Sequence, residues 1–239
     1  MEAYVLITGA SRGIGAAIAK KLAEQNYNLI LTCRNSGDKL QRIAGELAQA
    51  HRIRVLAEVC DMGNPEEVAA LFKRIPQPDI IINNAGISHI GLIQDMDIAC
   101  WNSLLATNLS SAFYTTKYGL PHMLHQGSGR ILNISSVWGI HGASMEVAYS
   151  ASKGGLNAYT KALAKEVAPS GIAVNALAFG LIDTQMNTHL SSEELESLCD
   201  EIPAGRAATV SEVADAVSHI LQMPHYFTGQ IITFDGGWM

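Results

Sequence analysis

The sequence predicts an α/β fold, a doubly wound seven-stranded parallel sheet with helices on both faces. Short apolar or β-branched runs alternate with helical patterns along the whole chain, which is typical of a parallel sheet covered on both sides. With 48% hydrophobic and 16% charged residues among 239, the chain has enough apolar material for one large core. Because there is no linker, repeat or low-complexity tract, we expect a single domain over residues 1–239.

The expected elements follow one another in regular alternation. The expected strands cover residues 3–7, 28–33, 54–59, 80–83, 130–134, 172–176 and 230–234. The expected helices cover residues 13–24, 38–49, 65–73, 98–125, 149–168, 192–201 and 210–222. Three helix starts carry capping signals. Asn64 stands before a proline, and Ser191 with Glu194 and Thr209 with Glu212 have the spacing of a capping box.

Composition argues against several classes of partner. The net charge of -6 and the absence of a basic run argue against a nucleic-acid partner. There is no signal-peptide pattern at the N-terminus and no apolar stretch of membrane-spanning length. Four cysteines lie far apart without a C-x-x-C pair: Cys33, Cys60, Cys100 and Cys199. We therefore expect a cytoplasmic protein with reduced thiols, no membrane partner and no metal site. The pair His122 and His125 has helical spacing, but two solvated histidines are the favoured interpretation.

A glycine-rich turn joins the first expected strand to the first helix. Residues 8–15 are T-G-A-S-R-G-I-G, a T-G-x-x-x-G-x-G spacing rather than G-x-G-x-x-G. Strand, glycine turn and helix in this order form the dinucleotide-binding device of Rossmann-like folds. The glycines let the backbone approach a pyrophosphate, whose charge is met by the amides at the helix start. Taken alone, the motif is also compatible with an ordinary tight connection.

The end of the second strand favours NADP(H) over NAD. A site for NAD is expected to have an acidic residue there, which would bond the ribose 2′-hydroxyl. The chain has Arg34 instead, and no carboxylate precedes Asp38. Arg34, helped by Arg12 in the glycine turn, is suited to hold a 2′-phosphate by charge-assisted hydrogen bonds. The alternatives are that Arg34 is a solvated loop cation and that Asp38 only caps the following helix.

Hydroxyl groups gather where the fifth strand ends and the next long helix begins. Ser135 and Ser136 follow the strand, and Tyr149 and Lys153 are four residues apart on one face of the helix. A phenol titrates near ~10 in water. A nearby ammonium lowers this pKa toward the range of a general acid or base. An isolated Y-x-x-x-K pattern is more often an unremarkable pair on a helix.

The order of these motifs resembles the short-chain dehydrogenase/reductase family from Thr8 to Gly237. The matching elements are the glycine turn, Asp61, the N-N-A-G run at residues 83–86, Asn108 in a long helix, and Ser136 thirteen residues before Tyr149-x-x-x-Lys153. Within this family the pattern is most similar to 3-oxoacyl-acyl-carrier-protein reductases. The thirteen-residue spacing selects Ser136 rather than Ser135.

The resemblance implies a role for each catalytic candidate. Tyr149 would donate a proton to the carbonyl oxygen as hydride arrives from the nicotinamide. Lys153 would lower the pKa of the phenol and hold the nicotinamide ribose. Ser136 would hydrogen-bond the substrate oxygen, and Asn108 would support a water chain behind Lys153.

The resemblance also implies the cofactor contacts. They are Gly9, Ser11, Arg12, Gly13, Ile14, Gly15, Arg34, Asp61, Asn84, Ala85, Gly86, Tyr149, Lys153, Ile182 and Thr184. Phe179 departs from the pattern, since it stands where the family has a proline after the sixth strand. Either the loop is less rigid here or Phe179 packs in the core. Residues 185–206 are expected to form a lid over the substrate.

The function implied is NADPH-dependent reduction of a 3-oxoacyl thioester to the 3-hydroxyacyl form. The alternatives are an NAD(P)-dependent dehydrogenase or reductase of a small alcohol, sugar or steroid ketone, and a non-catalytic nucleotide-sensing protein. The candidate pocket residues are His89, Trp138, His141, Met145 and Met186. The candidate basic residues for docking a carrier protein are Arg12, Lys20, Lys21 and Arg130. The family also implies a homotetramer built from the helices at 98–125 and 149–168 and the C-terminal strand.

Overall fold

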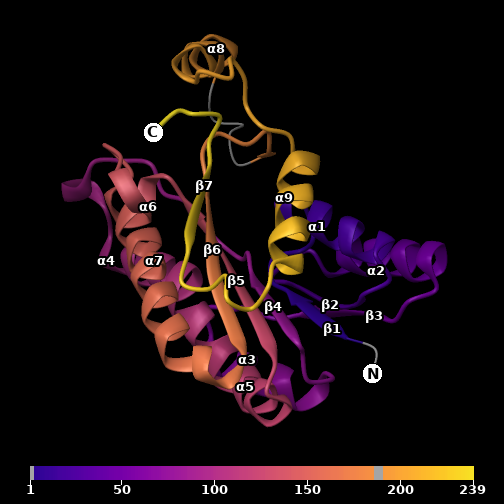
Figure 1. Cartoon of the computed structure of the whole chain (residues 1–239). Coiled ribbons are helices and arrows are strands. Elements are labelled where there is room, and N and C mark those ends of the chain that lie inside the picture. The colour runs from indigo at the N-terminus through magenta and orange to yellow at the C-terminus, as the bar shows by residue number, and fades with distance from the viewer. Residues whose placement is uncertain (1–2, 186–190) are drawn as a thin grey trace.

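A computed structural model of the chain describes residues 3–185 and 191–239. A single seven-stranded sheet with all strand pairs parallel runs through it, in the order β3-β2-β1-β4-β5-β6-β7 (Figure 1). The strands are β1 (Tyr4–Ile7), β2 (Asn28–Cys33), β3 (Val55–Val59), β4 (Ile80–Asn83), β5 (Gly129–Ser136), β6 (Ile172–Phe179) and β7 (Ile231–Phe234). The predicted fold class is confirmed.

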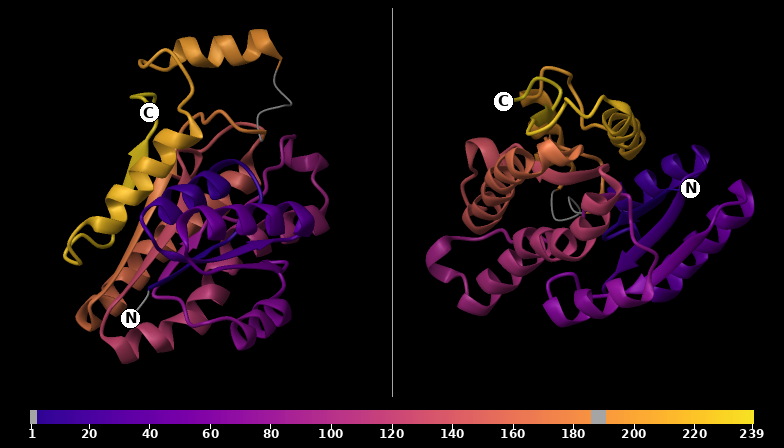
Figure 2. Two further views of the ribbon diagram at one scale, coloured as in Figure 1. Left: turned by 90° about the vertical axis from the view of Figure 1, so that its right-hand side faces the viewer. Right: turned by 60° about the horizontal axis from the view of Figure 1, so that its bottom comes forward.

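Helices cover both faces of the sheet, as the turned views also show (Figure 2). The α-helices are α1 (Gly13–Glu24), α2 (Gly37–His51), α3 (Pro65–Arg74), α4 (Ile98–Leu105), α5 (Ser111–Gln126), α6 (Trp138–His141), α7 (Val147–Val167), α8 (Ser192–Glu201) and α9 (Val210–Gln222). Short helical turns also lie at Ile93–Asp95 and Ala168–Ser170. One core cluster joins α1, α2 and α9 to the sheet, and a second joins α3, α5 and α7 to its other face.

The core follows from the burial pattern of strands and helices. Every residue of β2 and β4 is buried, as expected for central strands covered on both sides. On α9, the apolar residues Val213, Val217 and Leu221 recur at four-residue spacing and are all buried in the first core cluster. Removal of this apolar surface from water is the main stabilising term, at roughly 25 cal/mol per Å².

Strands β5 and β6 extend beyond the predicted bounds. Each has eight residues, and the two pair in register from Gly129 with Ile172 to Ser136 with Phe179. The sequence predicted strands that end at residues 134 and 176, because serine and the small residues that follow do not have a strong strand preference. Hydrogen bonding between β5 and β6 overrides this local preference. Both serines therefore lie in β5, at the carboxyl end of the sheet.

The predicted helix over residues 98–125 is interrupted. It consists of α4, a π-helical segment at Ala106–Ser110 and α5, with no break in the chain direction. A π-helical segment holds one extra residue in a turn and is frequent at functional sites. Hydrophobic periodicity does not reveal such a segment, since its residues are also compatible with an ordinary α-helix.

The predicted helix caps are confirmed. Asn64 Oδ1 accepts hydrogen bonds from the backbone N–H groups of Glu66 and Glu67, at 3.0 and 3.1 Å. Both capping boxes, at the starts of α8 and α9, have their two reciprocal hydrogen bonds. The alternative that Asp38 caps α2 is wrong, because the helix begins at Gly37 and Asp38 lies in its first turn.

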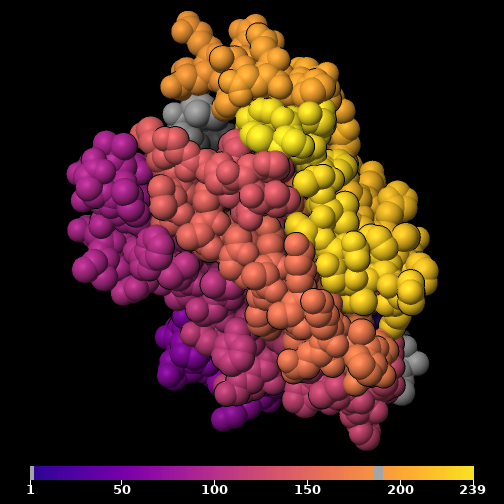
Figure 3. Space-filling model, turned by 60° about the vertical axis from the view of Figure 1, so that its left-hand side comes forward, coloured from indigo at the N-terminus to yellow at the C-terminus, as the bar shows by residue number. Residues whose placement is uncertain are grey.

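Helix α8 stands apart from the layers, beyond the carboxyl ends of the strands (Figures 1 and 2). None of its residues is buried. It belongs to the predicted lid at residues 185–206, of which residues 186–190, and with them Met186, lie outside the described part. The C-terminal segment, yellow in Figure 3, runs along the molecule from beneath α8. Within the described ranges, no helix combines the length and apolar character needed to cross a membrane.

Candidate active site

Four predicted site residues meet near the carboxyl end of β5. Ser136 is the last residue of β5, Tyr149 and Lys153 lie in the first turns of α7, and Asn108 comes from the π-helical segment. Side chains from three separate elements are thus brought to the edge of the sheet where open α/β folds bind ligands.

Lys153 is held rigidly although it carries a charge. Its side chain is buried, and its ammonium donates a hydrogen bond to the backbone O of Ile134 at 2.7 Å. The Nζ atom lies 5.7 Å from the centre of the Tyr149 ring. Burial lowers the pKa of Lys153 to about 8, because it disfavours the charged form.

The pKa of Tyr149 is shifted in the direction opposite to the predicted one. Burial raises it to about 12, the negative charge of Glu146 adds to the rise, and a hydrogen bond with Ser136 lowers it. Desolvation sets the direction of the shift, and the predicted lowering by Lys153 is not among its causes. The phenol keeps its proton at neutral pH, which is the form needed to donate one.

Asn108 is fixed by two neighbouring segments. Its side chain forms two hydrogen bonds of 2.8 Å with Ile87, accepting from the backbone N–H and donating to the backbone O. It also donates to Ser152 Oγ at 3.1 Å, and Ser152 in turn donates to the backbone O of Tyr149 at 2.7 Å. Ser152 is fully buried and was not among the residues predicted from the sequence.

Gly86 separates Asn108 from Lys153. A side chain at this position would place its Cβ 3.5 Å from Asn108 Oδ1 and 3.6 Å from Lys153 Nζ. The absence of a side chain thus leaves the two polar groups facing a common space.

The two neighbouring serines have different environments. Ser135 Oγ donates to Asn157 Oδ1 at 2.6 Å and is buried in the core. Ser136 Oγ accepts from the backbone N–H of Trp138 at 3.2 Å and hydrogen-bonds Tyr149. The structure therefore brings Ser136, and not Ser135, to the phenol.

The glycine turn is shaped by close contacts. Gly9 and Gly13 have positive φ angles of 69° and 53°, which side chains rarely adopt. A Cβ at Gly15 would lie 2.5 Å from Gly9 O and 2.6 Å from Asn84 Nδ2. Glycine at position 15 thus allows α1 to pack directly against the turn and present its first amides to a ligand.

The end of β4 braces this turn. Asn84 Nδ2 donates to the backbone O of Thr8 and Gly9, at 2.8 and 3.1 Å. Thr8 Oγ1 accepts from the backbone N–H groups of Asn84 and Ala85, both at 2.9 Å. The amide of Asn84 is therefore engaged in holding the turn. Thr8, the first residue of the predicted motif, thus supports the turn through contacts that the sequence did not predict.

The other predicted cofactor residues line the same edge. Thr184 lies across from the turn, since its Cγ2 is 3.7 Å from the position that a Cβ on Gly13 would occupy. Ile182 is buried and forms a β-bridge with Ala208. In the turn itself, Ser11 is buried, Arg12 is exposed and Ile14 packs against the first core cluster.

The carboxyl ends of β2 and β3 bring Arg34 and Asp61 together. Arg34 Nη1 lies 3.9 Å from Asp61 Oδ2, and both side chains are substantially exposed, at 47% and 36%. Asp61 Oδ1 also accepts from the backbone N–H of Gly63 at 2.9 Å. Such a long surface ion pair contributes little to stability, so both groups remain accessible to a ligand.

Comparison with known proteins agrees with this geometry. The family model for short chain dehydrogenases matches residues 3–195. The chain belongs to the short-chain dehydrogenase family. It is therefore an oxidoreductase of a family that uses nicotinamide cofactors.

Relatives of this short-chain dehydrogenase match over nearly its full length. An uncharacterized oxidoreductase, YmfI of Bacillus subtilis, is 41% identical over 100% of this chain and 99% of its own. The 3-oxoacyl-[acyl-carrier-protein] reductase FabG of Aquifex aeolicus is 38% identical, over 97% and 95%. The FabG protein of Staphylococcus aureus is 36% identical, over 99% and 98%.

In this short-chain dehydrogenase, Phe179 packs in the core. This was one of the two alternatives that the sequence left open for this residue. It is 4% exposed, and its ring meets Phe234 edge to face, with centroids 5.9 Å apart. The next residue, Gly180, approaches the backbone of Asp235 so closely that a Cβ would lie 3.0 Å from its Cα. Strand pairing and aromatic packing thus fix this segment without a proline.

The C-terminal residues of this dehydrogenase pack against α6, the short helix that follows Ser136. Trp238 packs edge to face on Trp138, with ring centroids 5.1 Å apart. Asp235 holds the tail by accepting from the backbone N–H groups of Gly237 and Met239, at 3.0 and 3.2 Å. This contact between residues a hundred positions apart had no signal in the sequence.

The other described candidate pocket residues lie in the loop after β4, at the end of α6 and in the turn before α7. The backbone N–H of Gly91 donates to Met145 O at 2.8 Å, which ties the loop after β4 to the turn before α7. His89 Nδ1 lies 3.5 Å from Cys100 Sγ, and His141 is exposed at the end of α6.

The interpretation of His122 and His125 as two solvated side chains holds only in part. His125 is exposed, but His122 is partly buried and its Nε2 lies 3.2 Å from Asp79 Oδ1. No cluster of potential metal ligands occurs in residues 3–185 and 191–239. All four cysteines are free thiols, and burial raises the pKa of Cys60 to about 12.

Two of the candidate docking residues lie away from the site of this dehydrogenase. Arg130 is at the start of β5 and lines a cavity at the amino ends of the strands, opposite the candidate site. Lys21 forms a 2.5 Å ion pair with Asp215 of α9. Neither is placed to flank the site entrance, whereas Arg12 lies in the glycine turn itself.

Proposed function

We propose that this short-chain dehydrogenase is an NADPH-dependent carbonyl reductase that converts a 3-oxoacyl thioester to the 3-hydroxyacyl form. The observation that carries the proposal is the convergence of Ser136, Tyr149 and Lys153 at one edge of the sheet, with the phenol protonated. The similarity to FabG reductases over 97% of the chain or more supports the choice of substrate class.

In this mechanism the chain's own residues orient the carbonyl and supply its proton. Ser136 and Tyr149, which already share a hydrogen bond, would both contact the carbonyl oxygen. As negative charge develops on that oxygen, these donors stabilise it and Tyr149 transfers its proton. Lys153 would return a proton to the phenol from a water chain supported by Asn108, since both side chains face the space beside Gly86.

The cofactor would supply the hydride. Gly13 and the start of α1 would hold its pyrophosphate, Arg34 its 2′-phosphate, Asp61 its adenine, and Thr184 its carboxamide. The turn fits such a group because glycine at positions 9 and 15 permits the close packing there, the side chain of Arg12 does not cap the start of α1, and Thr184 lies across from Gly13.

The proposed substrate class is a 3-oxoacyl thioester, as opposed to other carbonyl compounds. The relative YmfI of Bacillus subtilis is described only as an uncharacterized oxidoreductase, which keeps small alcohols, sugars and steroid ketones as a second group of candidate substrates. A screen of NADPH oxidation with acetoacetyl thioesters, diketones, sugars and ketosteroids distinguishes them. We expect the highest kcat/KM with thioesters, and activity confined to the other ketones would contradict the proposal.

Arg34 gives a direct test of cofactor choice. Hydrogen bonds to charged groups contribute ~1.5–3 kcal/mol, so Arg34→Gln should weaken NADPH binding by about 10- to 100-fold and leave NADH binding nearly unchanged. Fluorescence titration with both dinucleotides measures this. Arg42→Gln, an exposed arginine on α2 with the same change of charge, is the control. Tighter binding of NADH than NADPH by the unmodified protein would refute the assignment.

We further propose a cytoplasmic homotetramer that uses α4, α5 and α7 and the C-terminal strand at its interfaces. Exposed apolar residues such as Ile98 and Phe113, at 80% and 50%, favour an interface on α4 and α5. Light scattering that gives the 25.6 kDa mass of a single chain would contradict this assembly.

A further inference from the structure

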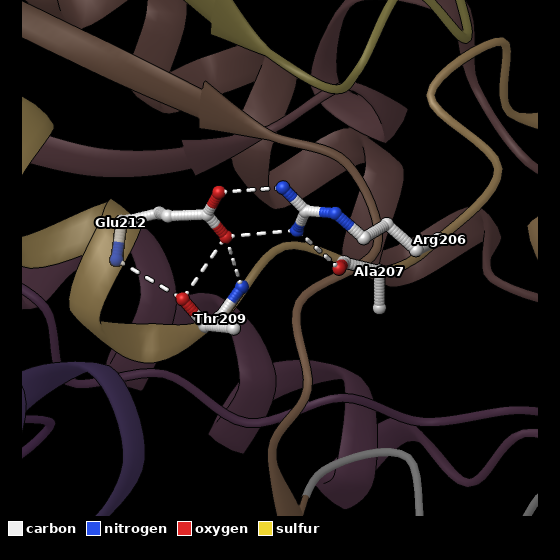
Figure 4. Close-up of polar contacts among 4 residues, drawn as sticks. All are labelled: Arg206, Ala207, Thr209 and Glu212. Atoms are coloured by element: carbon white, nitrogen blue, oxygen red, sulfur yellow. Dashed lines mark hydrogen bonds and ion pairs between the residues drawn. The ribbon is translucent and has the colours of Figure 1, made fainter.

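Arg206 and Glu212 form a clamp where the lid segment joins α9 (Figure 4). Arg206 donates from Nη2 to Glu212 Oε1 at 2.6 Å and from Nη1 to Glu212 Oε2 at 2.9 Å. Glu212 Oε2 also accepts from the backbone N–H and the hydroxyl of Thr209, both at 2.9 Å. Arg206 Nη1 reaches back to the backbone O of Ala207 at 3.1 Å. Residues 206–209 are thus fixed at the start of α9.

Ala208, at the centre of this clamp, is bonded to the chain that leads to Thr184. Its backbone N–H donates to Leu181 O at 3.0 Å, and its backbone O accepts from the N–H of Asp183 at 2.9 Å. This parallel bridge places residues 181–183 directly beside the clamp. Thr184 follows at once and lies opposite Gly13 in the glycine turn.

Because the clamp is exposed, it contributes little to the free energy of unfolding of the whole protein. Arg206 and Glu212 are 57% and 40% exposed, and surface ion pairs typically add little to the free energy of unfolding. The bidentate geometry instead restricts orientation. The pKa of Glu212 is lowered to about 2, first by the hydrogen bond from Arg206, so the carboxylate stays charged at neutral pH.

We propose that Arg206 and Glu212 are positioning residues for the cofactor: through Ala208, they hold residues 181–184 at the distance from the glycine turn that dinucleotide binding requires. The proposal rests on the proposed function, because it takes Ile182 and Thr184 as cofactor contacts. It is independent of the carbonyl substrate, since it concerns dinucleotide affinity alone.

The test is titration of the whole protein with NADPH and with NADH, without carbonyl substrate. Arg206→Met removes the clamp but keeps the capping box of α9, and Glu212→Gln removes the charge. We expect each to weaken dinucleotide binding about tenfold, with little change in the urea midpoint. The double variant should bind no more weakly than either single variant. Arg206→Lys should restore affinity only in part, because a lysine has no bidentate fork.

Asp215→Asn is the matched control, since it removes a carboxylate of similar exposure from the same helix, where it pairs with Lys21. It should bind the dinucleotide like the unmodified protein. Wild-type affinity in Arg206→Met and Glu212→Gln, or an equal loss in Asp215→Asn, would overturn the proposal.

With an active carbonyl substrate, the KM of the Arg206 and Glu212 variants for the cofactor should rise, while their kcat at saturation is kept. Preference for NADH would change the cofactor assignment alone, and an unmodified protein that binds neither dinucleotide would overturn both proposals.

Discussion

Tyr149→Phe is expected to reduce carbonyl reduction by about 100- to 10,000-fold, the range that general acid catalysis contributes. The substitution removes only the hydroxyl, whose pKa is raised to about 12 and which shares a hydrogen bond with Ser136. Since the ring remains beside Lys153, binding of NADPH should be nearly unchanged. Steady-state kinetics and a fluorescence titration on the same preparation separate the two effects.

Tyr159→Phe is the control for this substitution. Tyr159 lies on the same helix, is also partly buried, and hydrogen-bonds Thr116 instead of a site residue. It should retain turnover although it loses an equivalent hydroxyl. If Tyr149→Phe kept wild-type turnover, another group would have to donate the proton.

Gly15→Ala is expected to lower the free energy of unfolding by about 1–3 kcal/mol or more, as overpacking in a dense region does. The added Cβ would meet Gly9 O at 2.5 Å and Asn84 Nδ2 at 2.6 Å, and Asn84 is itself bonded to Thr8 and Gly9. The turn would have to move away from β4, so dinucleotide affinity should fall as well. Urea denaturation and NADPH titration measure the two losses.

Gly45→Ala makes the same chemical change with the opposite expected sign. Gly45 lies inside α2 with nothing within 4 Å of its Cβ position, so alanine should raise stability by about 0.5–1 kcal/mol through helix propensity. Equal effects of the two substitutions would show that the contacts at Gly15 do not determine its requirement for glycine.

The sequence predicted most of the fold because its signals are local. β2 and β4 match the expected bounds, as do α1, α8 and α9, since apolar runs and capping residues define them. The extra residues of β5 and β6 depend on register between strands about forty residues apart. No local pattern specifies such a register.

The candidate site was predictable in composition but not in its energetics. The spacing of Tyr149 and Lys153 indicated that they are neighbours, whereas the direction of the pKa shift depends on burial supplied by the whole fold. The hydrogen bonds of Thr8 and Ser152 were not predicted because they reach segments distant in the sequence. The ring contact of Trp238 with Trp138 was not predicted either, since the two residues are a hundred positions apart.

The π-helical segment at Ala106–Ser110 has a consequence for how this helix tolerates insertions and deletions. A side chain advances about 100° per residue around an α-helix, so one additional residue changes the phase of everything that follows. The side chains of α5 are therefore rotated, relative to those of α4, from the positions they would have in a regular α-helix of the same sequence. Loss of one residue here would keep the helix but rotate Asn108 relative to Ile87 and Ser152. The rotation of Asn108 around the helix axis, and not only its identity, therefore defines the site.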